Sequence, residues 1–375
     1  MRLHYRRYAP LLIALAASAV TTGAIARDRQ WTPEEAANWY AAQPWLAGAN
    51  FVPASAINQL EMWQAGTFDP ETIDRDLGYA AGAGFNCMRV FLHDLAWEAD
   101  PEGFYNRIER YLEIADRHSI KTMFVLFDAV WDPHPKPGTQ KAPTPGVHNS
   151  GWVQGPHIQV LSDESRHESM KPYVQGILKR FGRDPRILMW DLYNEPGNTN
   201  GNSYGHLEPE NKPGLSRLFL ERVFTWAREA APDQPLTAGA WMGLGRPEGG
   251  LDPLDQFMLG QSDIVTFHTY DDLEGAKRAV TRVSAVGRPM ICTEYMARTA
   301  NSRFEVIMPY LKSENIGAIH WGLVSGKSQT IYPWESWQKP FDSEPEVWFH
   351  DVFRPDGTPF SKAELDVIRS LTGRQ

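Results

Sequence analysis

The sequence predicts an α/β fold, namely a single-domain (β/α)8 TIM barrel in which eight parallel strands alternate with outer helices. Short apolar runs recur after residue 45, as expected for strands that are buried on both faces. Segments with helical periodicity separate these runs. The 375 residues contain no internal repeat and no linker that would divide the chain.

The predicted strands are short and nearly continuous in apolar residues. In chain order, they cover residues 47–52, 85–92, 121–127, 187–193, 236–241, 264–268, 289–293 and 317–321. An open, doubly wound sheet is the alternative fold, and it requires a glycine-rich turn after its first strand. Gly48-Ala49-Asn50 followed by Pro53 is not such a turn.

The predicted helices cover residues 70–84, 105–118, 167–181, 213–231, 254–259, 272–283, 303–311 and 361–371. The start of the first helix is indicated by Asp69, a suitable N-cap, and by Pro70, which is favourable at the first helical position. The helix over 213–231 ends at Pro232. Two long segments, 128–164 and 323–361, follow predicted strands and therefore lie at the face where barrel sites form.

The first 26 residues predict an export signal rather than part of the fold. Arg2, Arg6 and Arg7 precede a short apolar run, and a small-residue cleavage pattern ends at Ala26. The expected domains are therefore a signal peptide over 1–26 and a single (β/α)8 domain over 27–375. We expect the mature protein to be periplasmic or secreted, without a membrane anchor, because no later segment reaches the ~20 apolar residues of a span.

The composition of the chain limits the classes of molecule that it is expected to bind. The net charge of −9 makes nucleic acid and anionic membranes poor candidates, whereas a neutral glycan is compatible with it. The sequence contains 14 Trp, 13 Tyr and 17 Phe, and loop tryptophans commonly form flat platforms for sugar rings. Cys87 and Cys292 lie in apolar runs without metal-ligand spacing, so we expect buried free thiols. We expect no cofactor, and a monomer or weak homo-oligomer.

Polar side chains stand at the ends of the predicted strands. Because alternate residues of a strand face the same side, the last inward residue of each strand points into the barrel mouth. This set comprises Arg89, Asn194 with Glu195, His268 followed by Tyr270, Glu294 and Trp321. Burying such groups singly costs roughly 2–7 kcal/mol each, so their joint placement predicts a shared site. Two carboxylates from separate strand ends suit acid-base cleavage of a glycosidic bond.

The chain resembles clan A glycoside hydrolases, and most of all family 5, which includes cellulases, mannanases and xylanase-like enzymes. The resemblance covers about residues 45–372 and is carried by Asn194-Glu195-Pro196, the seventh-strand Glu294 and the supporting set Arg89, His268-Thr269-Tyr270 and Trp321. Family 5 members commonly carry a histidine two residues after an aspartate that follows the third strand. Here Val130 follows Asp128, and His134 or Trp131 is expected to occupy that space.

The resemblance implies a retaining mechanism without a metal, in which Glu294 is the nucleophile and Glu195 the acid/base. Arg89 and Tyr270 would keep Glu294 charged, and the charge of Glu294 would raise the pKa of Glu195. The expected substrate-binding residues are Arg89, Asn194, His268, Tyr270, Trp321, Asn50, Trp131 and Trp334, and weaker candidates are Trp241, Trp337, Asn58 and Glu61.

Three other functions compete with hydrolysis. A barrel that binds carbohydrate without turnover would not need both glutamates. A metal-dependent sugar isomerase could use Glu195, Glu294 and His268 as ligands, but Arg89 nearby would repel a cation. A phosphate-handling barrel would need a glycine-rich loop, and none follows the seventh strand. The sugar, its linkage and the choice between internal and terminal cleavage stay open.

Overall fold

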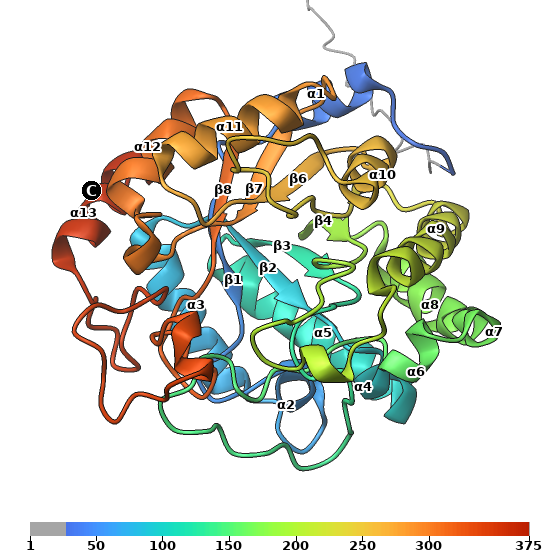
Figure 1. Ribbon diagram of the computed structural model, residues 1–375, viewed down its shortest axis with the longest axis horizontal. Coiled ribbons are helices and arrows are strands. Elements are labelled where there is room, and N and C mark those ends of the chain that lie inside the picture. Colours follow the sequence, from blue (N-terminus) through green and yellow to red (C-terminus); the bar gives the residue numbers. More distant parts are fainter. Residues whose placement is uncertain (1–27, 375) are drawn as a thin grey trace, which may run out of the picture.

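The computed structural model describes residues 28–374, and the predicted signal peptide lies outside them. Eight parallel strands surround a common axis, and helices surround the strands (Figure 1). The predicted barrel is confirmed. The strands are β1 Ala47–Phe51, β2 Cys87–Phe91, β3 Lys121–Val125, β4 Ile187–Asp191, β5 Leu236–Thr237, β6 Val265–His268, β7 Met290–Glu294 and β8 Gly317–His320.

The strand order β5-β4-β3-β2-β1-β8-β7-β6 shows where the barrel closes. β1 pairs with both β2 and β8, so the first and last strands join. β5 is only two residues long, although the sequence predicted a strand over 236–241. It does not form a ladder with β6; a single parallel bridge between Ala240 and Phe267 joins the two sides. The barrel is therefore nearly closed.

Each predicted helix is present within one or a few residues of its expected ends, apart from 105–118, which begins earlier, and 167–181, which is broken. The larger ones are α3 Pro70–Ala83, α5 Pro101–Arg117, α8 Lys171–Phe181, α9 Lys212–Ala230, α10 Pro253–Gln261, α11 Leu273–Ser284, α12 Phe304–Ser313 and α13 Lys362–Thr372. The start of the predicted 167–181 helix is taken by α7 Glu164–His167 and a 3-10 turn, η1 Glu168–Met170. None of the helices within 28–374 is long and apolar enough to cross a bilayer.

Four helices were not predicted, namely α1 Pro33–Ala41, α2 Gln59–Trp63, α4 Asp94–Ala99 and α6 Ile158–Leu161. Three of them are too short for an apolar periodicity to show. α1 has a readable signal, because Thr32 and Glu35 form a capping box beside Pro33. Ala36 and Tyr40 of α1 belong to one buried cluster with Met123 and Ile264, and the Tyr40 hydroxyl donates to Asn315 O just before β8, so this helix covers the end of the barrel where the strands begin.

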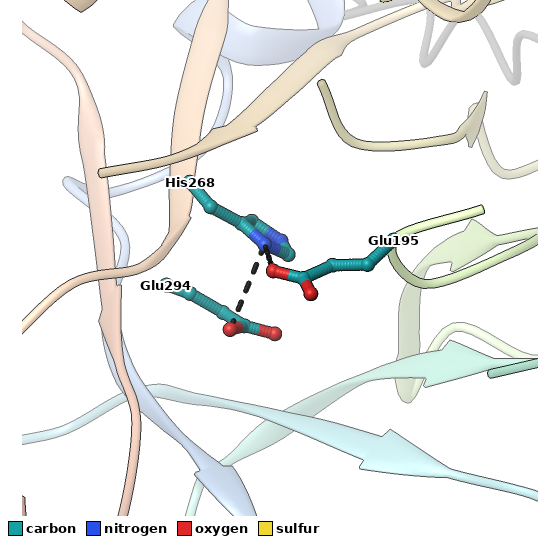
Figure 2. Close-up of side chains that lie close together, drawn as sticks. All are labelled: Glu195, His268 and Glu294. Atoms are coloured by element: carbon teal, nitrogen blue, oxygen red, sulfur yellow. Dashed lines mark hydrogen bonds and ion pairs between the residues drawn. The ribbon is translucent and has the colours of Figure 1, made fainter. Parts of the chain in front are cut away.

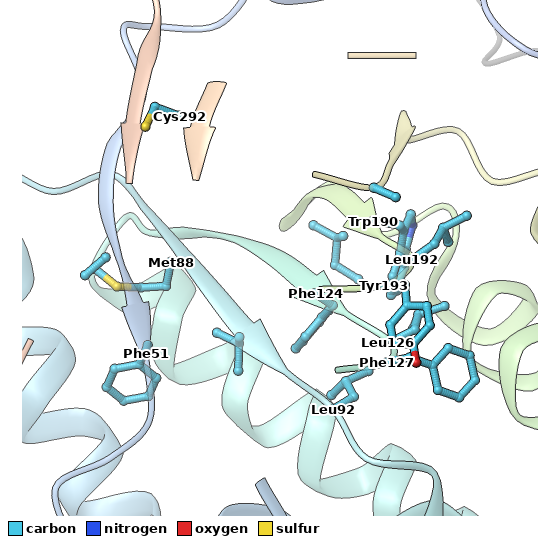
Figure 3. Packing of buried hydrophobic residues seen from close by; sticks show 14 of the residues in the cluster. Phe51, Met88, Leu92, Phe124, Leu126, Phe127, Trp190, Leu192, Tyr193 and Cys292 are labelled. Atoms are coloured by element: carbon cyan, nitrogen blue, oxygen red, sulfur yellow. The ribbon is translucent and has the colours of Figure 1, made fainter. Parts of the chain in front are cut away.

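Alternation along the strands divides the core into an inner and an outer part. On β2, Cys87 lies in the small inner cluster, whereas Met88 belongs to the large cluster between strands and helices. Phe124 and Trp190 stack in the outer cluster with ring centroids 5.8 Å apart (Figure 3). The two cysteines are buried free thiols, as predicted.

Candidate active site

Glu195 and Glu294 face one another across the barrel mouth. Glu294 ends β7, and Glu195 follows β4 (Figure 2). One oxygen of each carboxylate and a nitrogen of His268 lie within 4.8 Å of one another. This separation is far below the 10 Å or so that would rule out a shared reaction on one sugar.

The Glu294 carboxylate is fixed at both oxygens. Its Oε1 accepts a hydrogen bond of 2.8 Å from Arg89 Nη1. Its Oε2 accepts one of 2.7 Å from the Tyr270 hydroxyl. The Glu294 side chain is 5% exposed, so these bonds form largely out of water. The carboxylate is thereby held in one orientation.

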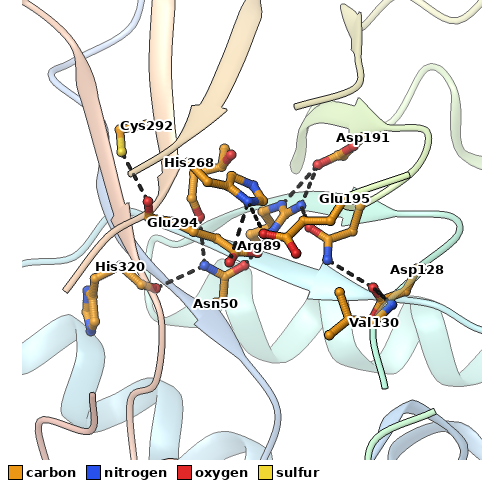
Figure 4. Close-up of polar contacts among 12 residues, drawn as sticks. Asn50, Arg89, Asp128, Val130, Asp191, Glu195, His268, Cys292, Glu294 and His320 are labelled. Atoms are coloured by element: carbon orange, nitrogen blue, oxygen red, sulfur yellow. Dashed lines mark hydrogen bonds and ion pairs between the residues drawn. The ribbon is translucent and has the colours of Figure 1, made fainter. Parts of the chain in front are cut away.

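Arg89 is the centre of the polar network beneath the mouth (Figure 4). Besides Glu294, its guanidinium donates to Asn50 Oδ1 at 2.8 Å, to Asn194 Oδ1 at 2.6 Å, and twice to Asp191 Oδ2 at 3.0 and 2.7 Å. An arginine has five N–H donors, and all five are used here. Two carboxylates, those of Asp191 and Glu294, therefore share one fully buried cation.

Asn194 is held from two sides. Its Oδ1 accepts from Arg89, and its Nδ2 donates to Asp128 Oδ1 at 2.9 Å. Asp128 in turn accepts at Oδ2 from Trp152 Nε1 at 2.6 Å. An amide nitrogen has two hydrogens, so the second hydrogen of Asn194 is available to a ligand.

The two glutamates titrate differently from free carboxyl groups. Burial raises the pKa of Glu195 to about 7, against the opposing effects of the Asn198 hydrogen bond and the Arg89 charge. The direction is the one expected, but the cause is loss of water rather than the charge of Glu294. Burial also raises the pKa of Glu294; His268, Arg89 and Tyr270 oppose this rise, and Glu195 adds to it.

His268 lies between the two carboxylates (Figure 2). Its Nδ1 is 2.9 Å from Glu195 Oε1 and 3.6 Å from Glu294 Oε2. Burial lowers the pKa of His268 to about 4, so the imidazole is neutral near pH 7. The three side chains could hold a metal ion by distance alone. The guanidinium of Arg89, 2.8 Å from Glu294, opposes a second cation there.

The backbone turns sharply at both glutamates. Glu195 has a φ of 42°, and Met296, two residues after Glu294, has a φ of 82°. Non-glycine residues in this left-handed region are uncommon and cluster at functional sites. After this turn, the Glu195 side chain points towards His268 and Glu294 (Figure 2).

The carboxylates line a cavity of about 330 Å³. Asn194, Tyr270 and all of the aromatic candidates except Trp337 also line it: Trp131, Trp241, Trp321 and Trp334. Trp337 stacks on Trp131 with ring centroids 5.1 Å apart and an interplanar angle of 15°. Arg89 and His268 are not among the residues that line this cavity, although each contacts one of its two carboxylates.

Other candidates have partners elsewhere. Asn50 donates both amide hydrogens to the carbonyl oxygens of Thr293 and His320, at 2.8 and 3.0 Å. Its Oδ1 accepts from Arg89, so the arrangement favours a role in holding Arg89 over direct sugar contact. His134 pairs with His157 at 3.4 Å instead of reaching the cavity.

Asn58 and Glu61 connect loops and are not among the residues that line the cavity. Asn58 caps α2 and donates to Gly151 O at 2.8 Å. Glu61 accepts from Lys327 Nζ at 2.5 Å. Their side chains join the segment after β1 to the long loops after β3 and β8.

Sequence reasoning missed several polar residues of the site. Asp191 could have been found from the sequence. A buried aspartate in an apolar strand needs a cationic partner, and Arg89 in another predicted strand is a candidate. Asn198, which donates to Glu195 Oε2 at 2.7 Å, lies in a loop without a pattern. His148 and His350 also line the cavity, and they come from the middle of the two long loops.

A parallel barrel that brings two carboxylates and a row of aromatic rings to the mouth of its strands defines an O-glycosyl hydrolase of clan A. The comparisons with known proteins agree. The chain belongs to glycosyl hydrolase family 5, whose Cellulase sequence model matches residues 52–327. No curated protein sequence matches the chain.

Solved structures show the same fold at low sequence identity. A β-1,4-mannanase from Aplysia kurodai has a TM-score of 0.55 at 14% identity, with 74% of this chain and 88% of that chain covered. A family 5 protein from Streptomyces cattleya, in complex with Manb1-4GlcNAc, has a TM-score of 0.59 at 13% identity, with 88% and 80% covered. The exo-β-1,4-mannosidase of an Opitutaceae bacterium has a TM-score of 0.59 at 18% identity, with 88% and 60% covered.

Proposed function

We propose that this glycoside hydrolase cleaves β-glycosidic bonds with retention of configuration, with Glu294 as nucleophile and Glu195 as acid/base. The observation that carries the proposal is the approach of the two carboxylates, which both line the cavity, to within 4.8 Å of one another. Retaining enzymes place these groups ~5–5.5 Å apart, whereas inverting enzymes leave room for a water at ~6.5–9.5 Å.

In the first step, a Glu294 oxygen forms a bond to the anomeric carbon as the bond from that carbon to the glycosidic oxygen breaks. Glu195 transfers its proton to the departing oxygen. A pKa of about 7 keeps Glu195 protonated in weakly acidic solution, which suits this role. Arg89 and Tyr270 aim Glu294 and stabilise its charge.

In the second step, Glu195 accepts a proton from water as the water oxygen bonds to the anomeric carbon and Glu294 departs. Asn194 donates its free amide hydrogen to the sugar 2-hydroxyl, a contact that strengthens in the transition state. Trp321 supports the sugar ring at the cleavage point, and its indole is already packed edge-on against Phe91 and Trp152.

Replacement of Glu294 by alanine tests this assignment. Hydrolysis of an aryl β-glycoside should be abolished, and added azide should restore turnover by attacking from the vacated space. Activity that persists without Glu294 would contradict the nucleophile assignment. The panel of aryl glycosides should include mannosides, because several structurally similar proteins carry mannanase names.

Two alternative functions predict different results in these assays. A barrel that binds glycans without turnover would bind oligosaccharides but hydrolyse none of the panel. A metal-dependent enzyme would lose activity with a chelator and regain it with zinc or magnesium, whereas we expect full activity with the chelator.

We also propose that residues 1–26 direct export and are removed. Amino-terminal sequencing of the protein recovered from its native host should find a chain that begins near residue 27. Recovery of the chain with Met1 from the soluble cytoplasm would contradict export.

A further inference from the structure

We infer that this enzyme removes one sugar at a time from the non-reducing end of its glycan, in a pocket closed by two interlocked loops. We further infer that His148 and His350, which come from these loops, accept hydrogen bonds from hydroxyls of the terminal sugar. The inference rests on the proposed function and deepens it by naming the end of the substrate that enters. We call residues 144–149 and 328–337 the end wall.

The two halves of the end wall are joined by hydrogen bonds. Gln329 Nε2 donates to the carbonyl oxygens of Thr144 and Val147, at 2.7 and 3.0 Å. Asn149 N donates to Ser328 O at 2.9 Å. Figure 1 shows the green loop after β3 and the orange-red loop after β8 on the same side of the barrel. These hydrogen bonds join the two loops into one wall.

One more hydrogen bond joins the two halves, and an aromatic contact attaches the wall to the site. His148 N donates to Ser336 Oγ at 2.9 Å. Trp334 packs edge-on against Tyr270, with ring centroids 5.2 Å apart and an interplanar angle of 89°. Tyr270 itself bonds Glu294. The end wall therefore adjoins Tyr270, the hydrogen-bond partner of Glu294.

The cavity is buried on one side and exposed on the other. On the side of the end wall, His148, Asn149 and His350 are only 2%, 1% and 1% exposed. On the side of the loop after β4, Gly201 and Asn202 line the same cavity and are exposed, although Gln338, next to the end wall, donates to Asn202 O at 3.3 Å. Glu195 precedes that loop.

This asymmetry orients the substrate. Because the acid protonates the departing oxygen, the leaving part of the glycan must extend from the Glu195 side, which is the open one. The sugar that becomes attached to Glu294 then lies towards the end wall, where no second sugar can follow it. The closed end is thus the non-reducing end of the substrate.

The two histidines of the closed end offer acceptors and no donors. His148 Nδ1 donates to Tyr332 O at 2.8 Å, and His350 Nδ1 donates to Met296 O. A carbonyl oxygen only accepts, so in each ring the hydrogen is on Nδ1. Burial lowers the pKa of His148 to about 4 and that of His350 well below its usual range, so both rings are neutral and each Nε2 has a lone pair.

These lone pairs lack donors among the described residues. His350 Nε2 is buried without a hydrogen-bond partner in residues 28–374. The two rings are 5.3 Å apart, and neither can donate through Nε2 to the other. A buried polar atom without a hydrogen-bond partner is unfavourable. Hydroxyl groups of a sugar are donors of the kind that would satisfy both.

Product analysis tests the closed pocket. β-Linked oligosaccharides of four to six sugars, labelled at the reducing end, should at first yield only free monosaccharide and labelled chains shortened by one. Short labelled fragments at early times would mean internal cleavage and would overturn this inference while leaving the proposed function intact. Failure to hydrolyse any oligosaccharide or aryl glycoside would instead overturn the proposed function.

Deoxy substrates test the histidines. For at least one aryl glycoside that lacks a single hydroxyl, kcat/KM of the unaltered enzyme should fall roughly three- to tenfold, as for the loss of one neutral hydrogen bond. His148→Ala or His350→Ala should lower kcat/KM for the parent glycoside by a similar factor, mainly through KM. On that deoxy analogue, the same substitution should cause no further fall in kcat/KM. If the kcat/KM of a variant fell by the same factor for every deoxy analogue as for the parent glycoside, recognition of a hydroxyl by that histidine would be contradicted.

A matched control is His118→Ala. His118 follows α5 and bonds Asp74 at the surface, away from the cavity. This variant should retain the kinetic constants and the response to deoxy substrates of the unaltered enzyme. Thermal unfolding of all three variants shows whether the barrel is intact, and His350→Gln is the second variant if His350→Ala does not fold.

Discussion

Arg89 Nη1 and Glu294 Oε1 form an ion pair of 2.8 Å inside the barrel, and the arginine side chain has no exposed surface. Asp191, on the opposite side of the guanidinium, makes the second ion pair at 2.7 Å. In the proposed mechanism, the charge of Arg89 therefore stays compensated while Glu294 is bound to a sugar. A buried charge that lost its only partner at that step would be costly.

Arg89→Met should destabilise the protein strongly, because two buried carboxylates would lose their cation. The free energy of unfolding in urea should fall by about 3–5 kcal/mol. Arg110→Met provides the control, since Arg110 pairs with Glu113 at the surface and its loss should change stability by no more than about 1 kcal/mol. Equal effects of the two substitutions would contradict the role of Arg89 described here.

Tyr270→Phe should impair catalysis more than folding. The lost hydroxyl donates 2.7 Å to Glu294 Oε2, and hydrogen bonds to charged groups contribute about 1.5–3 kcal/mol. We expect kcat/KM for an aryl glycoside to fall roughly 10- to 150-fold. Tyr79→Phe, which removes a surface hydroxyl 3.4 Å from Pro355 O, should be neutral. A neutral effect at Tyr270 would mean that Glu294 is aimed by Arg89 alone.

The pH dependence of activity should carry the signature of Glu195. Its pKa of about 7 means that activity requiring the acid declines as the pH rises through about 7. In Glu195→Gln, turnover of a substrate whose leaving group needs no proton should lose this alkaline limb. Glu113→Gln, at the surface, should retain it. An alkaline limb that survives in Glu195→Gln would assign the titration to another group.

The same group should make stability depend on pH. The pKa of Glu195 is higher in the folded state than its ordinary value of 4.5, so between about 4.5 and about 7 the folded protein binds more protons than the unfolded chain. Its contribution to stability is complete below the unfolded pKa and is lost as the pH rises through the folded one. Urea unfolding of Glu195→Gln across this range should show a weaker decline than the unaltered enzyme. An identical decline would mean that the pKa of Glu195 is not raised in the folded protein.

Asp191→Asn should shift the acidic limb of the pH–rate profile towards lower pH. The substitution keeps the size of the side chain but removes a negative charge beside Arg89. Arg89 then stabilises ionised Glu294 with less competition, so the nucleophile stays charged at lower pH. An acidic limb that moves upward, or does not move, would contradict this coupling.

The barrel was predictable because strands buried on both faces leave a strong pattern, and the same periodicity identified Arg89, Glu195 and Glu294. β5 was predicted four residues too long, since apolar residues over 238–241 continue without a ladder. The structural role of Asn50 could not be derived, because its partners are backbone carbonyls of other strands. His148 and His350 could not be found, because loop conformation depends on contacts between distant segments.

The five donors of Arg89 are all engaged before any sugar arrives. If Glu294 is the nucleophile, as proposed, such preorganisation means that the dipoles around it need little rearrangement as charge develops in the transition state. Differences in rate among substrates should then arise chiefly from how each glycan binds in the cavity. Laboratory evolution towards a new sugar would therefore change residues of the loops and leave Arg89 and its hydrogen-bond partners unchanged.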